Sequence, residues 1–167
     1  MNFLRSSLYD ITQNHDLATH AERIEALRRD SAHSIQILPD QAPPNEYNCV
    51  MHALGLSKDD FDVPALAASQ TKTRFIDFLI GRGYLIPQSN TITGSLIVYS
   101  MSGAAQHIGR MISNSRVESK WGTGHLYEHA IWEVPCSYGD HVAFFDPIDH
   151  ELVLDYFCEC QKSAECQ

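Results

Sequence analysis

The sequence predicts a single domain of the α+β class, in which N-terminal helices pack on an antiparallel β-sheet. Apolar residues at helix spacing occupy the first part of the chain, and short strand-like segments occupy the second part. The length of 167 residues and the hydrophobic content of 44% suit one core. We therefore treat residues 1–167 as one domain, in which residues 1–40 form a helical packing segment.

The first helix is expected within the first forty residues. Apolar side chains recur there every three or four residues with charged residues between them: Leu17, Ala21, Ile24 and Leu27. That spacing places the apolar side chains on one helix face. The segment 41–46, which contains two prolines, then interrupts regular structure, because proline lacks a backbone donor and restricts the residue before it.

Two further helices are expected after this interruption. Residues 48–56 have the composition of a short helix with Cys49 in its first turn. Residues 63–82 predict a longer helix, because apolar residues form a stripe within it: Phe75, Phe78 and Leu79. Cys49 is therefore expected at the start of the helix that follows the proline-containing segment.

The pattern changes to strands in the second half of the chain. Residues 94–100 predict a strand, and residues 106–112 and 116–121 predict a hairpin. Two more strands are expected at 142–145 and 151–157. Strands that follow helices, rather than alternating with them, favour the α+β class.

Charge and hydropathy patterns exclude several classes of partner. The chain has 21 acidic and 12 basic residues and a formal net charge of −9. This is the opposite of a phosphate-binding surface, so we expect no nucleic-acid partner. The sequence has no apolar run long enough for a membrane span and no signal-peptide pattern at its N-terminus. We expect no membrane partner and a cytoplasmic protein as synthesised, with signal-independent secretion left open.

The cysteines predict neither a disulfide framework nor a metal site. Their number is odd and their spacing is irregular: Cys49, Cys136, Cys158, Cys160 and Cys166. The C-terminal cluster does not have a standard zinc spacing. His125, Glu128 and His129 lack a fourth ligand, so they are not read as a metal site either. We expect no cofactor.

Cys49 is the candidate nucleophile and His107 is the candidate general base. A thiol attacks carbonyl carbon as the thiolate, and a helix N-terminus is expected to lower the pKa of Cys49. Histidine accepts and returns protons near neutral pH. His107 is favoured because it begins a strand, and Gly109 on the same face is expected to leave room beside the imidazole. His52, three residues after Cys49, is interpreted as a packed side chain.

These motifs resemble the papain-like cysteine hydrolases, specifically the NlpC-type peptidases and amidases. The matching text is Asn48-Cys49-Val50-Met51-His52-Ala53-Leu54, then Gly94-Ser95-Leu96-Ile97-Val98-Tyr99, then His107-Ile108-Gly109. The resemblance covers residues 45–122 and implies a papain-like core. It also implies a thioester mechanism in which Cys49 attacks an amide and His107 carries the proton. The oxyanion would be bound by the Cys49 backbone N–H and the Asn48 side chain.

The residue that orients the histidine is where the chain departs from this family. The family has a polar residue, often histidine, on the strand after the base, and Ser119 stands at that position. Glu128 is the preferred candidate for the role, because a carboxylate stabilises an imidazolium, and Ser119 is the alternative. Several aromatic residues are expected to pack in the core, some of them beside His107: Trp121, Tyr127, Trp132 and Tyr138.

Three functions follow from this interpretation. The first is a cysteine peptidase or amidase that acts on a peptide-like or protein amide. The second is a catalytically inactive papain-like module that binds or regulates a partner. The third is an acyltransferase or transglutaminase-like enzyme that uses the same Cys–His pair. A small acidic hydrolase of this kind is also typical of effectors and toxins, which pair with an inhibitor or immunity protein.

Overall fold

A seven-stranded antiparallel sheet forms the centre of the computed structural model, which describes residues 3–14, 16–39, 43 and 45–163. In sheet order the strands are β1 (Gln36–Leu38), β6 (Leu126–Ala130), β5 (Arg116–Lys120), β4 (Ala104–Met111), β3 (Leu96–Met101), β7 (His141–Phe145) and β2 (Pro87–Gln88). Every neighbouring pair is antiparallel. The predicted α+β class with an antiparallel sheet is confirmed.

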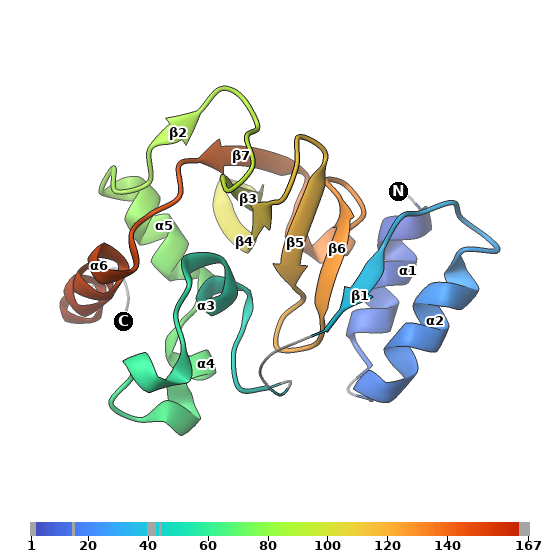
Figure 1. Ribbon diagram of the computed structural model, residues 1–167, viewed down its shortest axis with the longest axis horizontal. Helices are drawn as coiled ribbons and strands as arrows, with labels where there is room; N and C mark the ends of the chain where they lie inside the picture. The colour runs from blue at the N-terminus through green and yellow to red at the C-terminus, as the bar shows by residue number, and fades with distance from the viewer. Residues whose placement is uncertain (1–2, 15, 40–42, 44, 164–167) are drawn as a thin grey trace.

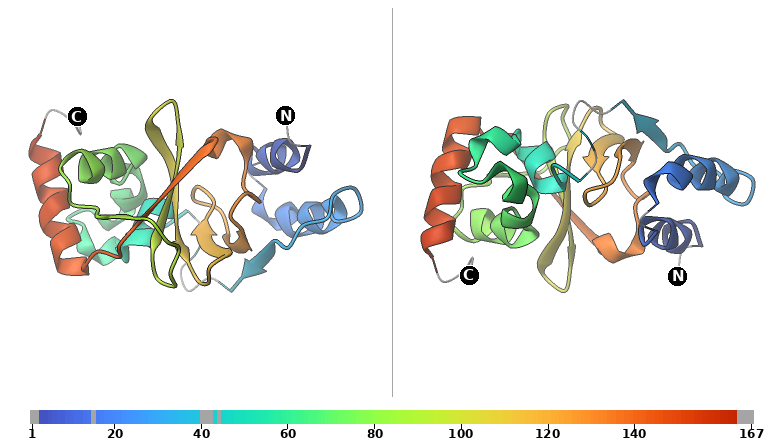
Figure 2. Two further views of the ribbon diagram at one scale, coloured as in Figure 1. Left: turned by 90° about the horizontal axis from the view of Figure 1, so that it is seen from above. Right: turned by 90° about the horizontal axis from the view of Figure 1, so that it is seen from below.

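Helices cover both faces of this sheet (Figure 1, Figure 2). One face carries α1 (Phe3–Thr12) and α2 (His20–Leu27), and the other carries α3 (Cys49–Leu54), α4 (Ala67–Gln70), α5 (Thr73–Gly81) and α6 (His150–Lys162). Short 3₁₀ turns connect these elements: η1 (Leu17–Thr19), η2 (Lys58–Asp60), η3 (Pro64–Leu66) and η4 (Cys136–Tyr138). The N-terminal helices therefore pack on the sheet as predicted.

The register of the strands assigns each side chain to a face. Directly opposite residues in an antiparallel pair share a face, and so do alternate residues along a strand. Met111 is opposite Val117, which is opposite His129, so His107 and His129 both face α1 and α2. Glu118 is opposite Glu128, and both carboxylates project from the other face, which packs against α3.

Two of the predicted elements are wrong. Residues 151–157 are not a strand but part of α6, whose buried residues Val153 and Cys160 lie two helical turns apart. Asp149 begins this helix by accepting a hydrogen bond from the Glu151 backbone N–H at 2.9 Å. Residues 63–82 are not one helix but η3, α4 and α5, because the backbone is extended at Thr71 and Lys72.

The other predictions hold in outline, although three strands are absent from them. The hairpin of β4 and β5, the strands β3 and β7, and the short helix α3 are confirmed. The sequence patterns did not predict β1, β2 or β6. Residues 41, 42 and 44 of the proline-containing segment 41–46 lie outside the described residues.

Gly109 allows β5 to approach β4 closely. A Cβ at this position would lie 2.8 Å from Val117 Cγ1, 2.9 Å from Ser119 Cβ and 3.0 Å from the Glu118 carbonyl oxygen. The glycine is therefore required by the neighbouring strand. The structure therefore explains Gly109 by the closeness of β5, whereas the sequence had suggested that it leaves room beside the His107 imidazole.

We predict that Gly109→Ala destabilises the fold by about 1–3 kcal/mol, because the added methyl group forces β5 to shift. Urea unfolding measures the change. Gly81→Ala is the matched control, because nothing lies within 4 Å of a Cβ at Gly81 and alanine favours a helix. Equal stability of Gly109→Ala and the wild type would contradict the close approach of the strands.

Candidate active site

Asn48 fixes the start of α3, where Cys49 is the first helical residue. Its Oδ1 accepts hydrogen bonds from the backbone N–H groups of Val50 at 3.0 Å and Met51 at 3.1 Å. Its Nδ2 donates to the carbonyl oxygens of Ala68 at 2.8 Å and Thr71 at 2.7 Å. Both ends of the side-chain amide are therefore occupied, so the expected oxyanion role of Asn48 is not supported by this geometry.

The Cys49 thiol is buried, with 7% of the residue exposed. Burial raises the pKa of Cys49 from 9.0 to about 11, and the N–H groups of Ile108, Val50 and Cys49 itself oppose this rise. The expectation that the helix start lowers this pKa is therefore wrong. A helix of six residues has a small dipole, and loss of water around the sulfur outweighs it.

The Cys49 thiol approaches β4, the strand that carries His107, where the pairing of β4 with β5 ends. The described ladder between these strands contains only Arg110 opposite Glu118 and Met111 opposite Val117, although β4 begins at Ala104. Ile108 lies beyond the last paired residue, and its N–H approaches the Cys49 sulfur. The Cys49 sulfur therefore lies beside Ile108, the residue that follows His107 in β4, without a hydrogen bond to either His107 nitrogen.

His107 is buried, with 1% of the residue exposed, and it has no hydrogen bond to either ring nitrogen from the described residues. Burial lowers the pKa of His107 well below 6.5, and the nearby His129 and His52 lower it further. The ring is therefore uncharged at neutral pH. Since both nitrogens lack partners, neither Glu128 nor Ser119 orients this imidazole in the structure.

Tyr138 covers one face of the His107 ring. The two rings are stacked with centroids 3.9 Å apart and an interplanar angle of 12°. Burial raises the pKa of Tyr138, and the nearby Cys49 raises it further, so the phenol lies within electrostatic range of the sulfur. Of the four aromatic residues expected to pack in the core, Trp121 and Tyr127 are buried, Tyr138 lies against His107, and Trp132 is 42% exposed.

The turn that carries Tyr138 is held by α1. Arg5 donates from Nε to the carbonyl oxygen of Val134 at 3.2 Å and from Nη2 to those of Pro135 at 3.3 Å and Gly139. Gly139 has φ +111°, and a Cβ there would lie 2.1 Å from the Ser100 carbonyl oxygen. The backbone is therefore tightly constrained beside Tyr138.

The two candidates for the orienting residue are engaged elsewhere. Glu128 accepts a hydrogen bond from Arg116 Nε at 2.9 Å, on the face of the sheet opposite to His107. Ser119 Oγ lies 2.8 Å from His129 Nε2, and His129 Nδ1 lies 2.8 Å from the Ala130 carbonyl oxygen. A carbonyl oxygen only accepts, so Nδ1 donates its proton and Nε2 accepts from Ser119.

His129 was not predicted to belong to this site. It lies on the same face as His107, is fully buried, and is close enough to lower the pKa of His107. Its position on β6 was missed because the pattern around Tyr127 was interpreted as a loop. The alternation of Tyr127 and His129 with the charged Glu128 was the available sequence signal for a strand.

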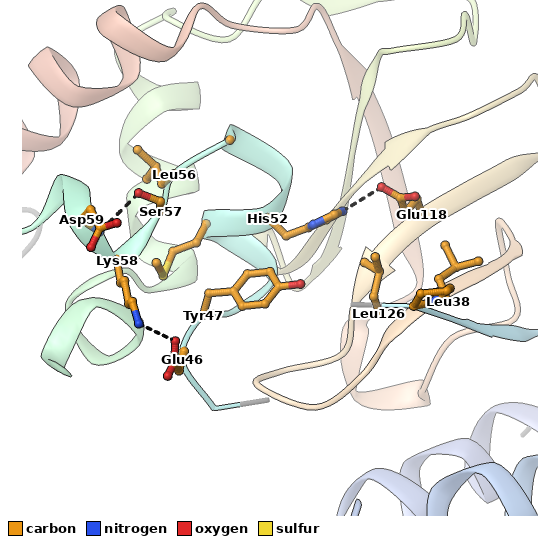
Figure 3. Close-up of a pocket in the computed structure, with 13 residues that line it drawn as sticks. Leu38, Glu46, Tyr47, His52, Leu56, Ser57, Lys58, Asp59, Glu118 and Leu126 are labelled. Atoms are coloured by element: carbon orange, nitrogen blue, oxygen red, sulfur yellow. Dashed lines mark hydrogen bonds and ion pairs between the residues drawn. The ribbon is translucent and has the colours of Figure 1, made fainter. Parts of the chain in front are cut away.

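An open cavity of about 690 Å³ lies beside α3 (Figure 3). His52 and Glu118 face each other in its wall, with Nε2 and Oε1 3.1 Å apart but poorly aligned for a hydrogen bond. Cys49 and His107 are not among the described residues that line it. His52 is thus largely packed, with 15% of its side chain exposed, and it also borders the cavity.

No metal site is found in the described part of the chain, where no three His, Cys, Asp or Glu residues are grouped to hold an ion. In the C-terminal cysteine cluster, Cys158 is exposed on α6 and Cys160 is buried, whereas Cys166 lies outside the described residues. Within residues 3–14, 16–39, 43 and 45–163, no helix is long and apolar enough to cross a membrane.

We predict that the protein loses stability as the pH falls from about 7 to about 5, because the His129 imidazole is buried without a charge in the folded protein but becomes protonated in the unfolded chain. Its pKa is lowered by burial from 6.5 to about 4. The unfolded chain therefore binds a proton in this range while the folded chain does not, which costs about 2 kcal/mol. His107 acts in the same direction.

Urea unfolding at the two pH values tests this expectation, with His129→Gln showing a smaller pH dependence than the wild type. His141→Gln is the control, because His141 is exposed and should leave the pH dependence unchanged. An unchanged pH dependence in His129→Gln would contradict the assignment.

One family matches this chain, and the match contains all of the candidate site residues. The family described as "Domain of unknown function (DUF7689)" matches residues 40–146, which is more than half of the chain. The chain therefore belongs to this family. No curated protein and no solved structure matches the chain.

Proposed function

We propose that this member of the DUF7689 family is a cysteine hydrolase with a papain-like, NlpC-type core that cleaves a peptide-like amide bond. Cys49 is the nucleophile and His107 is the general base. The proposal is carried by the position of the Cys49 sulfur beside β4, one residue from His107, where the pairing of β4 with β5 ends. The sulfur is approached by the N–H of Ile108, the residue after His107, and the described residues leave both His107 nitrogens without a hydrogen bond.

A buried imidazole without a hydrogen-bond partner destabilises the fold, because its polar atoms have lost water and gained nothing. Such a group calls for an explanation beyond packing. A role in proton transfer supplies one, since the base must present a free nitrogen to the thiol and then to the leaving group. The fixed position of Cys49 at a capped helix start supports its role as the nucleophile.

The pKa shifts support a neutral resting pair. Burial raises the pKa of Cys49 to about 11 and lowers that of His107, so both the thiol and the imidazole are uncharged near neutral pH. His107 then removes the proton as the sulfur attacks, rather than holding a thiolate beforehand. Because both residues are buried, substrate reaches them only after the groups that cover them move.

The proposed reaction has two steps. In the first, the Cys49 sulfur bonds to the amide carbonyl carbon, His107 accepts the thiol proton and returns it to the departing amine, and the C–N bond breaks. In the second, water gives a proton to His107 and attacks the thioester, releasing the acid and the thiol. The Cys49 N–H is the proposed oxyanion donor, and Asn48 acts by fixing that N–H.

Tyr138 takes the place of a hydrogen-bonded orienting residue in this proposal. Its stacked ring restricts rotation of the His107 imidazole, and the constrained turn beside it resists displacement. Stacking leaves both imidazole nitrogens free, whereas a carboxylate would occupy one of them. We therefore assign Tyr138 as a positioning residue.

A binding module is the second candidate function, and one observation favours it. The cavity beside α3 is open, while Cys49 and His107 lie outside its wall. In that case the protein binds a ligand at the cavity and the Cys–His pair has no turnover. Acyl transfer uses the same first step, with an amine in place of water, so the products distinguish it from hydrolysis.

We predict that Cys49→Ala and His107→Ala each reduce amide cleavage by at least about 100-fold while circular dichroism shows an intact fold. Mass spectrometry of a pool of blocked peptides, with backbone and side-chain amides, detects the cleaved products. Cys158→Ala is the matched control, because Cys158 is a free, exposed thiol. Full turnover by His107→Ala would overturn the proposed base.

We predict that Tyr138→Leu lowers kcat by about 10-fold or more with little change in KM, because the imidazole loses its stacked partner. Tyr138→Phe keeps the ring and is expected to restore most of the rate. Equal kcat values for the two variants would show that stacking does not position His107.

A further inference from the structure

The cavity beside α3 is built by two parts of the fold that lie on the same face of the sheet. One wall comes from the segment around α3 and η2, with Tyr47, His52 and Lys58, and the other comes from the sheet, with Glu118 and Leu126. Figure 3 shows the Tyr47 ring between the His52–Glu118 pair and the Lys58–Glu46 pair, with Leu38 and Leu126 beyond its hydroxyl end. The cavity of about 690 Å³ is large enough for one long side chain and adjoining backbone.

The residues that line the cavity carry an excess of negative charge. Three of them are carboxylates: Glu46, Asp59 and Glu118. Lys58 compensates Glu46, because its Nζ lies 2.8 Å from Glu46 Oε2. Glu118 is held ionised, since contact with His52 lowers its pKa. Among the described residues, neither Glu118 nor Asp59 has a lysine or arginine nitrogen within 4.0 Å. Arg110 still lowers the pKa of Glu118. Asp59 adds to Glu46 in raising the pKa of Lys58, so weaker charge interactions are present.

Two further cationic side chains adjoin residues of the lining, and both are bound to the main chain. Arg110 donates from Nε to the Ala53 carbonyl oxygen at 2.8 Å, and Lys120 donates from Nζ to the Gly124 carbonyl oxygen at 2.6 Å. Neither belongs to the described lining of the cavity. A ligand that enters the cavity therefore meets the carboxylates of the lining residues first.

The rest of the lining suits an aliphatic stem. Its apolar residues come from β1, β6, α3 and the segment after α3: Leu38, Met51, Leu56 and Leu126. Tyr47 adds an aromatic ring, which is braced by the Lys120 ammonium 3.8 Å from its centroid. Apolar walls with a carboxylate at one end match the shape and charge of a lysine or arginine side chain.

We propose that this cavity binds the side chain of a lysine or arginine in the peptide whose amide Cys49 attacks. The claim that this peptide is the substrate of Cys49 rests on the proposed function. The α3 segment joins the two sites, because His52 follows Cys49 by three residues and Tyr47 precedes it by two. A basic side chain held against Glu118 fixes the peptide beside the helix that carries the nucleophile.

The test measures binding and cleavage separately. Blocked pentapeptides of one sequence, with lysine, arginine, norleucine, glutamine or glutamate at the centre, are titrated into the full-length Cys49→Ala protein by calorimetry. Lysine and arginine peptides are expected to bind at least about 10-fold more tightly than the norleucine peptide. Glu118→Gln in the same background is expected to remove that preference.

Glu128→Gln is the matched control for Glu118→Gln. The two glutamates are directly opposite on neighbouring strands and project from the same face. Their side chains are similarly exposed, 29% for Glu118 and 27% for Glu128, but Glu128 is paired with Arg116 and does not line the cavity. Glu128→Gln should therefore retain the preference for basic peptides.

The outcomes separate the two proposals. Equal binding of all five peptides, or an unchanged preference in Glu118→Gln, would overturn the assignment of the cavity. A preference that depends on Glu118, with cleavage of the same basic peptides by the wild type, supports both proposals. The same preference without cleavage by the wild type would keep the cavity as a basic-peptide site and overturn the hydrolase.

Discussion

The buried side chain of Asn48 is the interaction on which the candidate site depends. It caps α3 through two backbone N–H groups and holds the chain around Thr71 through two carbonyl oxygens. The first contacts fix where the helix begins, and the second fix the helix against the segment that follows α4. Cys49 therefore occupies one defined position beside β4. The Asn48 side chain is suited to this place because its oxygen accepts from the helix N–H groups while its nitrogen donates to the carbonyl oxygens.

Two opposing effects act on the Cys49 thiol, and burial is the larger. The N-terminus of a helix stabilises a negative charge by about 0.3–1 kcal/mol at exposed sites, whereas desolvation of a buried group shifts a pKa by up to several units. The raised pKa of about 11 reflects this balance. A reactive thiolate is therefore not a property of the resting protein. In the proposed mechanism, activation requires His107 as the proton acceptor on β4.

The pairing of β4 with β5 ends close to Cys49 and Tyr138, which come from opposite faces of the sheet. A continuous ladder would separate α3 from Tyr138, because they lie on opposite faces. Loss of pairing beyond Arg110 leaves the Ile108 N–H available to the sulfur, and Cys49 also acts electrostatically on Tyr138, which stacks on His107. The open cavity belongs to the α3 face alone, which is why it is lined by His52 and Glu118 and not by His107.

The sequence by itself determined the features that depend on local chemistry. The capping side chain of Asn48, the left-handed Gly55 and the intervening helix were predictable from their residue types, and so were the hairpin of β4 and β5 and the α+β class. The tertiary structure decided which groups meet. Glu128 was chosen for its charge, but the register turns it away from His107, while Tyr138 and His129 approach from η4 and β6. Burial and strand register are properties of the assembled sheet, and they decide both the pKa of Cys49 and the partners of His107.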